Sequence, residues 1–413
     1  MIYYLILRIF NFIIFSLSIS NKKARLWIGG RKNWRARLLK ECSSDKKWIW
    51  FHCASYGEFE DGRIVIEETK RTFSDYAILI TFSSPSGYEA KKSYTFADHI
   101  CYLPLDIPSN ASDFIDIVKP VVAIFVRNDI WMNYLKELKS RQIPSLLVAF
   151  CMNEHSSFVK WPQHSFYRNA FSMFDTVFVQ NNKTNEVLQK NFGLKNIINA
   201  GNTRANTICE THSQQHLFPD IEKFVLSDFC IIAGSTLEKD CLIFMKTYSQ
   251  MQHLKLKWII VPHEINHIEI NKYTASSNRM IKYSDIDKLN ANHNLLWLDN
   301  VGMLSKIYRY ADIAFIGGGF NKIGIHSILE PAVYGCPVAF GPNHRFYVEA
   351  LDLLDRGGVE IVRNESEFQK FINNYFSNSE LLKKIMKENQ AYVFEIKGDV
   401  AIVIDKIRQL IKK

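Results

Sequence analysis

A carboxylate stands where an apolar run gives way to a helical pattern, in the segment FHCASYGEFEDGR (51–63). This residue, Glu58, follows the small and polar residues 54–57. The dipole of a helix stabilises negative charge at the helix N-terminus, so we expect Glu58 to stay ionised at neutral pH. An ionised carboxylate can accept a proton from a hydroxyl group, which is the role of a general base. Taken alone, the segment would equally suit a simple helix cap.

Small and polar residues also follow three apolar runs in the second half of the chain. They are Gly234-Ser235-Thr236 after FCIIA, Pro262-His263-Glu264 after KWIIV, and Gly317-Gly318-Gly319 after IAFI. Glycine lets backbone N–H groups approach an anion closely, and a helix N-terminus adds a favourable dipole. Ordinary tight turns use the same residues, but three such loops in one domain predict a nucleotide site. Neither a GxGxxG nor a P-loop motif is present, which argues against dinucleotides and P-loop chemistry.

The segment GIHSILEPAVYGCPVAFGP (324–342) carries a histidine and a carboxylate four residues apart. On a helix, His326 and Glu330 would project from one face. A carboxylate at the edge of a cleft can accept hydrogen bonds from both ribose hydroxyls, as a nucleotide-sugar site requires. The alternative is a helix cap with a chance histidine.

Strand-like and helix-like patterns alternate along the chain. This alternation predicts an α/β fold with parallel sheets that are covered by helices on both faces. A polar stretch at 209–224 reads as a linker between two doubly wound domains that face a cleft, with ligands at the carboxyl ends of the strands. The helical patterns include 61–73, 130–142 and 380–413. The predicted strands are 47–54, 76–82, 99–105, 121–126, 144–150 and 176–180, then 229–235, 257–263, 295–299, 313–319 and 337–342.

Length and composition bound the class of protein. A chain of 413 residues exceeds one ordinary core, which favours two domains. The net charge of +9 fits an anionic partner, such as nucleic acid, a phosphorylated substrate or an anionic membrane, or simply a solvated basic surface. No arginine-rich block or nucleic-acid motif favours nucleic acid. The eight cysteines form no CxxC pair, which predicts buried free thiols rather than disulfides or a zinc site.

The first twenty residues, MIYYLILRIFNFIIFSLSIS, are strongly apolar. They lack the basic start of a cleaved signal peptide but are long enough for a spanning helix. Because Arg8 and Asn11 are costly inside a bilayer, an interfacial helix is the alternative, and a helix buried in the protein's own core is a third. The basic residues that follow would hold the remainder at the cytoplasmic face and could contact lipid phosphates. These basic residues are Lys22, Lys23, Arg25, Arg31 and Lys32.

Several segments, in this order along the chain, together resemble the 3-deoxy-D-manno-octulosonic acid (Kdo) transferases of lipopolysaccharide assembly. The similarity runs from the N-terminus to about residue 360, and WIGGRKNW (27–34) looks like the opening of the family. The other segments are ASYGEFEDGR (54–63), YLPLDIPSNASDFIDIVKP (102–120), FVQNNKTNEVL (178–188), GNTR (201–204), AGSTLEKD (233–240), VPHE (261–264) and FIGGGFNKIGIHSILEPAVYGCPVAFGPN (315–343).

The resemblance implies an inverting glycosyltransferase of the B type, with CMP-Kdo as donor and the lipid A precursor lipid IV(A) as acceptor. It implies a membrane anchor or interfacial helix at 1–21, an acceptor-binding Rossmann-like domain at 22–210 and a CMP-sugar-binding one at 211–413. The last helix of the chain is expected to pack back on the first domain. The enzyme would work at the cytoplasmic face of the inner membrane, with no cofactor, metal ion or nucleic acid. An acidic pair, Asp285 and Asp287, reads as a surface turn and not as a metal site.

The resemblance also assigns residues. Glu58 matches the general base, Asp129 stands where the family has a glutamate thought to stabilise the transition state, and Arg204 matches a basic position that is often lysine. Relatives often continue with Phe-Asp, where this chain has Ala205-Asn206. These departures leave open a catalytically impaired lipid A-binding paralogue, and a UDP-sugar transferase or epimerase of the same fold is a further alternative. The donor-site candidates are Ser235, Pro262, His263, Gly317, Gly318, Gly319, His326, Glu330 and Asn343.

Overall fold

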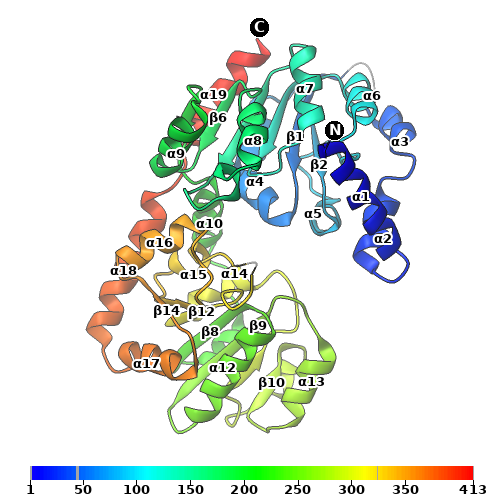
Figure 1. Cartoon of the computed structure of the whole chain (residues 1–413). Helices are drawn as coiled ribbons and strands as arrows, with labels where there is room; N and C mark the ends of the chain where they lie inside the picture. Colours follow the sequence, from blue (N-terminus) through cyan, green and yellow to red (C-terminus); the bar gives the residue numbers. More distant parts are fainter. Residues whose placement is uncertain (1, 43–45, 323, 413) are drawn as a thin grey trace. The chain divides into compact units, whose positions relative to one another are not determined.

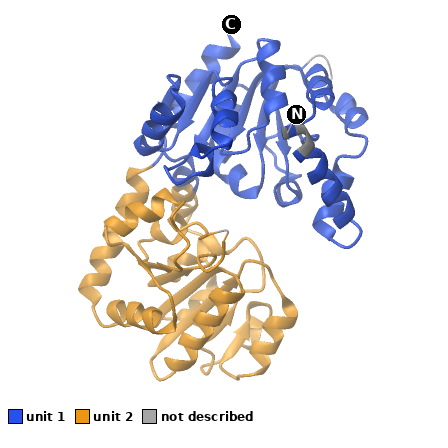
Figure 2. Ribbon diagram, in the orientation of Figure 1, with its two compact units in different colours: residues 1–207, 397–413 blue, residues 208–396 orange. Residues whose placement is uncertain are grey.

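The computed structural model describes residues 2–42, 46–322 and 324–412. The chain divides into two compact units (Figures 1 and 2). Unit 1 comprises residues 1–207 and 397–413, and unit 2 comprises residues 208–396. The predicted boundary followed residue 210, and helix α19 (Val400–Ile411) belongs to unit 1, the domain on which the last helix was expected to pack.

The predicted linker at 209–224 is wrong, because most of this segment is helical. It contains the end of α10 (Thr203–Ser213) and most of α11 (Pro219–Val225). Helix α11 buries Ile221 and Phe224, and Arg309 Nη1 donates to the carbonyl oxygen of His216 at 2.6 Å. The polar composition of the segment reflects the exposed face of α11 and the turn before it.

Unit 1 is built on a seven-stranded parallel sheet with the strand order β3-β2-β1-β4-β5-β6-β7. The predicted parallel sheet is confirmed, and β7 is the strand that the sequence did not predict. The strands are β1 (Trp48–Cys53), β2 (Ala77–Phe82), β3 (His99–Tyr102), β4 (Pro120–Val126), β5 (Ser145–Phe150), β6 (Thr176–Val179) and β7 (Ile197–Asn199). The helices are α4 (Tyr56–Thr72), α5 (Pro85–Lys91), α6 (Pro108–Val118), α7 (Met132–Ser140), α8 (Gln163–Phe171) and α9 (Asn182–Phe192), with a short 3-10 turn at Ser157–Val159.

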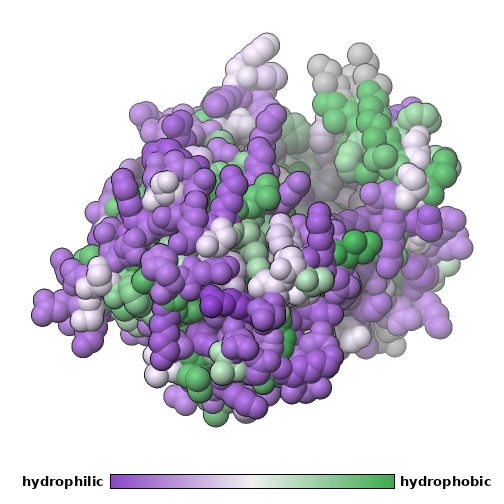
Figure 3. Space-filling view, turned by 90° about the horizontal axis from the view of Figure 1, so that it is seen from below, coloured by the Kyte–Doolittle hydropathy of each residue, from purple (hydrophilic) through white to green (hydrophobic). Residues whose placement is uncertain are grey.

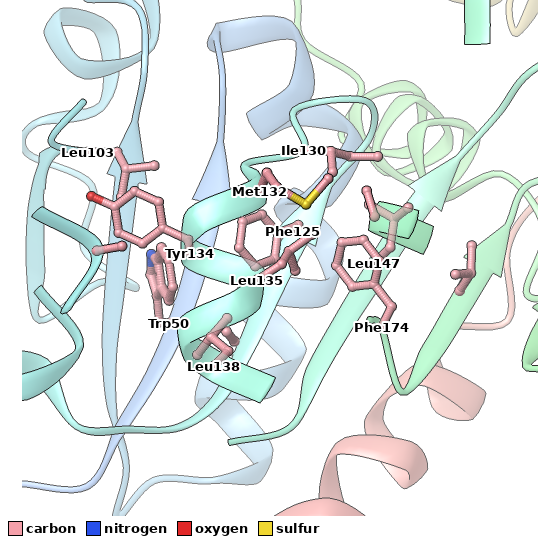
Figure 4. Packing of buried hydrophobic residues seen from close by; sticks show 14 of the residues in the cluster. Trp50, Leu103, Phe125, Ile130, Met132, Tyr134, Leu135, Leu138, Leu147 and Phe174 are labelled. Atoms are coloured by element: carbon pink, nitrogen blue, oxygen red, sulfur yellow. The ribbon is translucent and has the colours of Figure 1, made fainter. Parts of the chain in front are cut away.

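The two faces of this sheet have separate cores, because successive side chains of a strand point to opposite faces. On one face, Trp50 packs with Phe125 and Tyr134 beneath α6 and α7 (Figure 4). On the other face, Phe51 belongs to a cluster that α4 and α19 cover, with Ile404 contributed by α19. Strands buried on both faces explain the nearly continuous apolar runs that made β1, β4 and β5 predictable.

Unit 2 is also built on a seven-stranded parallel sheet, in the order β10-β11-β9-β8-β12-β13-β14. The outermost strands, β10 and β14, were not predicted. The strands are β8 (Phe229–Thr236), β9 (Leu256–Pro262), β10 (Met280–Lys282), β11 (Leu295–Trp297), β12 (Ile313–Ile316), β13 (Val338–Phe340) and β14 (Val359–Ile361). The remaining helices are α12 (Glu238–Gln250), α13 (His267–Ala275), α14 (Leu304–Ile307), α15 (Leu329–Ala332), α16 (Val348–Asp355), α17 (Glu365–Phe376) and α18 (Ser379–Glu395), with 3-10 turns at Tyr283–Lys288 and Tyr308–Tyr310.

Three helices precede the first strand of unit 1: α1 (Ile2–Leu17), α2 (Lys22–Gly30) and α3 (Trp34–Glu41). In the part of the chain that the structure describes, no helix is both long and apolar enough to cross a bilayer. The Tyr3 hydroxyl of α1 donates to the carboxylate of Asp106, which anchors this helix to unit 1. Further along α1, apolar side chains remain exposed, and a green group of them lies at the upper right of Figure 3. They include Ile6, Ile9, Phe12, Ile13 and Phe15.

Two other predictions concern single residue types. All eight cysteines are free thiols, and six of them are buried, as predicted. The acidic pair at 285 and 287 lies in a short 3-10 turn, where Asp285 forms ion pairs with Lys282 at 3.1 Å and Lys288 at 2.8 Å. This is the surface turn that the sequence predicted.

Candidate functional site

In unit 1, the acidic candidates lie at the carboxyl edge of the sheet. Glu58 is in the first turn of α4, directly after β1, and its Oε2 accepts a hydrogen bond from the Ser55 hydroxyl at 3.3 Å. Asp129 follows β4, the neighbour of β1 in the sheet. The parallel pairing therefore brings two carboxylates that are distant in sequence to the same edge.

Asp129 is held by three donors on a single oxygen. Its Oδ2 accepts from His52 Nε2 at 2.7 Å, from Ser83 Oγ at 2.9 Å and from Trp131 Nε1 at 3.0 Å. Burial raises the pKa of Asp129, but the hydrogen bonds from these three side chains and the charge of His52 outweigh burial and lower that pKa below its usual value. Asp129 is therefore ionised at neutral pH.

Glu58 behaves in the opposite way. Burial, followed by the negative charges of Asp129 and Asp61, raises the pKa of Glu58 to about 8, although Arg127 and a backbone hydrogen bond at Ser55 act in the other direction. The expectation that the helix dipole keeps Glu58 ionised at neutral pH is wrong, because desolvation and two nearby carboxylates outweigh the dipole. The site thus contains two carboxyl groups of opposite protonation, a pattern typical of paired acid and base groups.

The third candidate of unit 1, Arg204, lies in the first turn of α10. The preceding residue fixes this helix against α4, because Thr203 Oγ1 donates to the carbonyl oxygen of Asp61 at 2.5 Å. The carboxylate of Asp61 in turn accepts from Arg127 Nε at 2.6 Å. The start of α10, the start of α4 and the end of β4 are thus tied together, and they carry Arg204, Glu58 and Asp129 respectively.

The residues after Arg204 have structural roles. Ala205 is fully buried. The Asn206 side chain pairs in both directions with the backbone of Gly398, accepting from its N–H at 2.6 Å and donating to its carbonyl oxygen at 2.9 Å. This pairing attaches the segment before α19 to the rest of unit 1.

In unit 2, the end of β8 is in direct contact with the loop after β12. The Gly317 N–H donates to the Gly234 carbonyl oxygen at 2.9 Å, and a Cβ at position 317 would lie 2.2 Å from the Ser235 carbonyl oxygen. Ser235 itself has a left-handed backbone with φ +53°. Only glycine fits at 317, which explains part of the glycine run physically.

The other two glycines of this run are equally confined. Gly318 has φ +93°, and its N–H donates to Asp240 Oδ2 at 2.8 Å, an oxygen that also accepts from the Leu237 N–H at 2.8 Å. The Gly319 carbonyl oxygen accepts from the Asn343 N–H at 2.9 Å, and the Asn343 side chain donates to the Asn321 carbonyl oxygen at 3.0 Å. The loops after β8, β12 and β13 therefore form one connected surface.

Two histidines complete the loop cluster of unit 2. The rings of His263, which follows Pro262 at the end of β9, and His326 stack with centroids 4.5 Å apart. Burial, and then the charge of His263, lowers the pKa of His326 to about 4, so His326 is neutral at physiological pH. The backbone N–H of His326 donates to the Gly317 carbonyl oxygen at 3.1 Å.

The predicted helical relationship between His326 and Glu330 is wrong. Residue 326 precedes the helix, and Glu330 is the second residue of the four-residue helix α15. Gly324, with φ +92°, and the contact of His326 with Gly317 hold the chain before α15 in an extended loop. The structure thus brings Ser235, His263, His326, Asn343 and the three glycines together, and it places Glu330 on the adjoining helix.

Comparison with known proteins places this geometry in a family. A family model described as 3-deoxy-D-manno-octulosonic-acid transferase (kdotransferase) matches residues 32–207. The 3-deoxy-D-manno-octulosonic acid transferase of Aquifex aeolicus is 28% identical over 91% of this chain and 96% of its own length. The enzyme of the same name from Chlamydophila psittaci is 24% identical over 84% of this chain and 82% of its own. These matches support the Kdo transferase family for this chain.

The relatives named Kdo transferase support a glycosyltransferase. The crystal structure of a glycosyltransferase from Rickettsia africae matches 89% of this chain and 98% of its own, with a TM-score of 0.57 and 15% identity. This likeness shows a shared fold, in which two parallel-sheet α/β units resemble the B-type glycosyltransferases. The region matched by the Kdo transferase model contains Glu58, Asp129 and Arg204.

Sequence reasoning missed the residues that support the Kdo transferase candidates. His52 lies inside an apolar run, Ser83 follows β2, and Asp240 lies on α12. Each acts on a candidate from another loop, so its partner cannot be read from local sequence. The available signal was a single histidine within the apolar run of β1, the strand that leads to Glu58.

Proposed function

We propose that this family member transfers Kdo from CMP-Kdo to the lipid A precursor lipid IV(A) by a single inverting displacement. The observation that carries the proposal is the Glu58–Asp129 pair, in which one carboxyl group is ionised and the other has a pKa of about 8. Such a pair can divide the work between proton transfer and stabilisation of positive charge.

In the proposed reaction, a hydroxyl oxygen of lipid IV(A) forms a bond with the anomeric carbon of Kdo. The bond from that carbon to the phosphate oxygen breaks, and CMP leaves with the bonding electrons. The hydroxyl proton moves to the Glu58 carboxylate, so Glu58 must lose its own proton beforehand. The ionised Asp129 stabilises the positive charge that develops on the Kdo ring.

The proposed donor site uses the loops of unit 2. The Gly317 and Gly318 N–H groups donate within the protein, so the Gly319 N–H and backbone N–H groups of the 234–236 loop would stabilise the phosphate charge that grows as CMP leaves. Arg204 of unit 1 is proposed separately as a basic group for the transition state. Glu330 would accept hydrogen bonds from the ribose hydroxyls, and His263, His326 and Asn343 would contact the nucleotide. The scheme needs no metal ion or other cofactor.

We also propose that α1 lies at the surface of the inner membrane on its cytoplasmic face, as an interfacial helix. Its exposed apolar residues would enter the boundary between headgroups and acyl chains, near the lipid acceptor. Lys22 and Lys32 are exposed and remain candidates for lipid phosphates. Arg31 is no longer a candidate for lipid phosphates, because its guanidinium donates to the backbone carbonyl oxygens of Trp27, Ser83 and Leu103.

The test is incubation of the purified full-length protein with CMP-Kdo and lipid IV(A) in detergent or membranes, followed by mass spectrometry of the lipid. We expect one or more Kdo residues on the lipid, and little or none with Glu58→Gln. Lipid binding without product would favour the impaired paralogue. Thermal protection by UDP but not by CMP would favour a UDP-sugar enzyme. An unchanged rate in Glu58→Gln would refute the role of Glu58.

A further inference from the structure

His52 is a buried histidine whose two ring nitrogens are both hydrogen-bonded. It is the penultimate residue of β1, and its side chain is 1% exposed. Nδ1 lies 2.8 Å from Thr81 Oγ1 on β2, and Nε2 lies 2.7 Å from Asp129 Oδ2 after β4. The imidazole therefore joins three neighbouring strands of the sheet at the edge that carries Glu58.

The hydrogen bonds around Thr81 and Asp129 bear on the protonation of His52. Trp50 Nε1, which can only donate, bonds to Thr81 Oγ1 at 2.8 Å. The Thr81 hydroxyl has two possible acceptors, His52 Nδ1 at 2.8 Å and the Phe51 carbonyl oxygen at 3.3 Å, and the shorter contact is to Nδ1. Trp131 Nε1 also lies 3.0 Å from His52 Nε2, but the ionised Asp129 carboxylate, 2.7 Å from Nε2, has no proton to donate. Nε2 must therefore carry a proton and donate it to Asp129.

The other two donors to Asp129 share the same oxygen. Ser83 Oγ and Trp131 Nε1 also reach Oδ2, and Ser83 is itself fixed through its carbonyl oxygen, which accepts from Arg31 Nη2 at 2.8 Å. Three donors on Oδ2 define the plane of the carboxylate and direct Oδ1 away from them. Oδ1 is thus the oxygen left to face a substrate.

We propose that His52 is a positioning residue for the glycosyl transfer: its Nε2–H fixes the Asp129 carboxylate by Oδ2, so that Oδ1 meets the sugar ring in the transition state. This inference rests on the proposed function. It concerns kcat more than substrate binding, because a carboxylate that stabilises charge developing only in the transition state contributes little to the ground-state complex.

Two amide substitutions separate the two nitrogens of His52. The amide nitrogen of a glutamine can occupy the place of Nε2 and still donate to Asp129, whereas that of an asparagine reaches only the place of Nδ1. We expect His52→Gln to keep kcat within about threefold of the wild type, and His52→Asn to lower kcat at least about tenfold with KM for CMP-Kdo changed by less than about threefold.

A second readout is the pH profile of kcat/KM. Without the donor at Nε2, the Asp129 carboxylate is released, and its charge acts less strongly on Glu58. The acid-side midpoint of the profile should therefore move to lower pH in His52→Asn and stay unchanged in His52→Gln. The titratable and charged groups that face Asp129 are His52 of β1, Cys53 of β1, Glu58 of α4, Tyr3 of α1, Arg31 after α2 and Tyr167 of α8.

The matched control is His164, a partly buried histidine of the same unit. Its Nε2 bonds to the Asn191 carbonyl oxygen at 2.7 Å, and its ring stacks on Phe192. His164→Asn should leave kcat and the midpoint unchanged. Equal kcat values and equal midpoints for His52→Gln and His52→Asn would overturn the proposal, as would a loss confined to KM.

Should His52→Asn fail to fold, Ser83→Ala removes another donor from Oδ2 without altering β1, and the proposal then requires the same fall in kcat. An inactive wild type would count against the proposed function and not against the positioning. In that case, NMR can still test the positioning, because the chemical shift of the Asp129 carboxyl carbon reports the protonation of that group. The proposal requires that Asp129 titrates at higher pH in His52→Asn than in His52→Gln.

Discussion

The negative charge of Asp129 is one of the causes that raise the pKa of Glu58, although the two residues follow different strands of the unit 1 sheet. Asp129 can remain ionised because three side chains donate to it, while burial leaves Glu58 without comparable support. The ionised Asp129 therefore favours the protonated form of Glu58. Activity that depends on ionised Glu58 must then depend on pH.

The first prediction concerns this pH dependence. If Glu58 is the base, kcat/KM should rise with pH through a midpoint at about 8 and level off at higher pH, because Glu58 is ionised over that range. Asp129→Asn removes a negative charge beside Glu58, so the midpoint should move to lower pH even though the maximal rate falls. Initial rates of transfer from CMP-Kdo, measured from about pH 5.5 to about pH 9.5 so that the range brackets the expected midpoint, would show both effects.

A surface carboxylate serves as the control for that experiment. Asp285 lies in a 3-10 turn of unit 2, where it pairs with lysines, so Asp285→Asn should leave the midpoint in place. A midpoint in Asp129→Asn equal to that of the wild type would show that the two carboxyl groups do not interact in solution.

The sequence predicted those elements whose burial leaves a local pattern. The central strands carry continuous apolar runs, whereas β7, β10 and β14 have three residues each and owe their pairing to a neighbouring strand. The position of Glu58 was predictable from its motif, but its protonation was not, since it depends on Asp129 and Asp61. His326 was assigned to a helix by spacing alone, but it lies before α15, where its backbone N–H bonds to the Gly317 carbonyl oxygen.

The second prediction compares two glycines with similar backbone angles. Gly318 has φ +93° and Gly302 has φ +89°, but a Cβ at 318 would lie 2.3 Å from the Gly324 carbonyl oxygen, whereas a Cβ at 302 meets nothing within 4 Å. Both alanine variants bear the left-handed penalty of about 1–2 kcal/mol. Only Gly318→Ala should also displace the loop and weaken CMP binding, at least about tenfold by calorimetry. Equal binding by the two variants would argue against a nucleotide site at this loop.

The third prediction concerns the attachment of the C-terminal helix. Asn206→Ala loses both hydrogen bonds to Gly398 and should destabilise unit 1 by about 1–3 kcal/mol, while Asn206→Asp keeps an acceptor for the Gly398 N–H and should lose less. Hydrogen exchange of amides 400–411 would speed up in Asn206→Ala. The exposed Asn374 of unit 2 provides the control, since Asn374→Ala should change neither property. If hydrogen exchange of α19 is unchanged in Asn206→Ala, the apolar face of α19 alone holds this helix in unit 1.

The last prediction tests α1 as an interfacial helix. Phe12 is 70% exposed on α1, and Ile268 is 83% exposed on α13 of unit 2, so a glutamate at either position disturbs no core. Burying a phenylalanine side chain in an apolar phase is worth about 1.5–3 kcal/mol, so Phe12→Glu should weaken binding to phosphatidylglycerol-containing vesicles by about tenfold or more. Ile268→Glu should sediment with vesicles like the wild type. The anchor of α1 in unit 1, the Tyr3–Asp106 hydrogen bond, is unaffected by either change, so both variants should keep their melting temperature. If Phe12→Glu binds vesicles as well as Ile268→Glu does, the apolar face of α1 contacts something other than lipid.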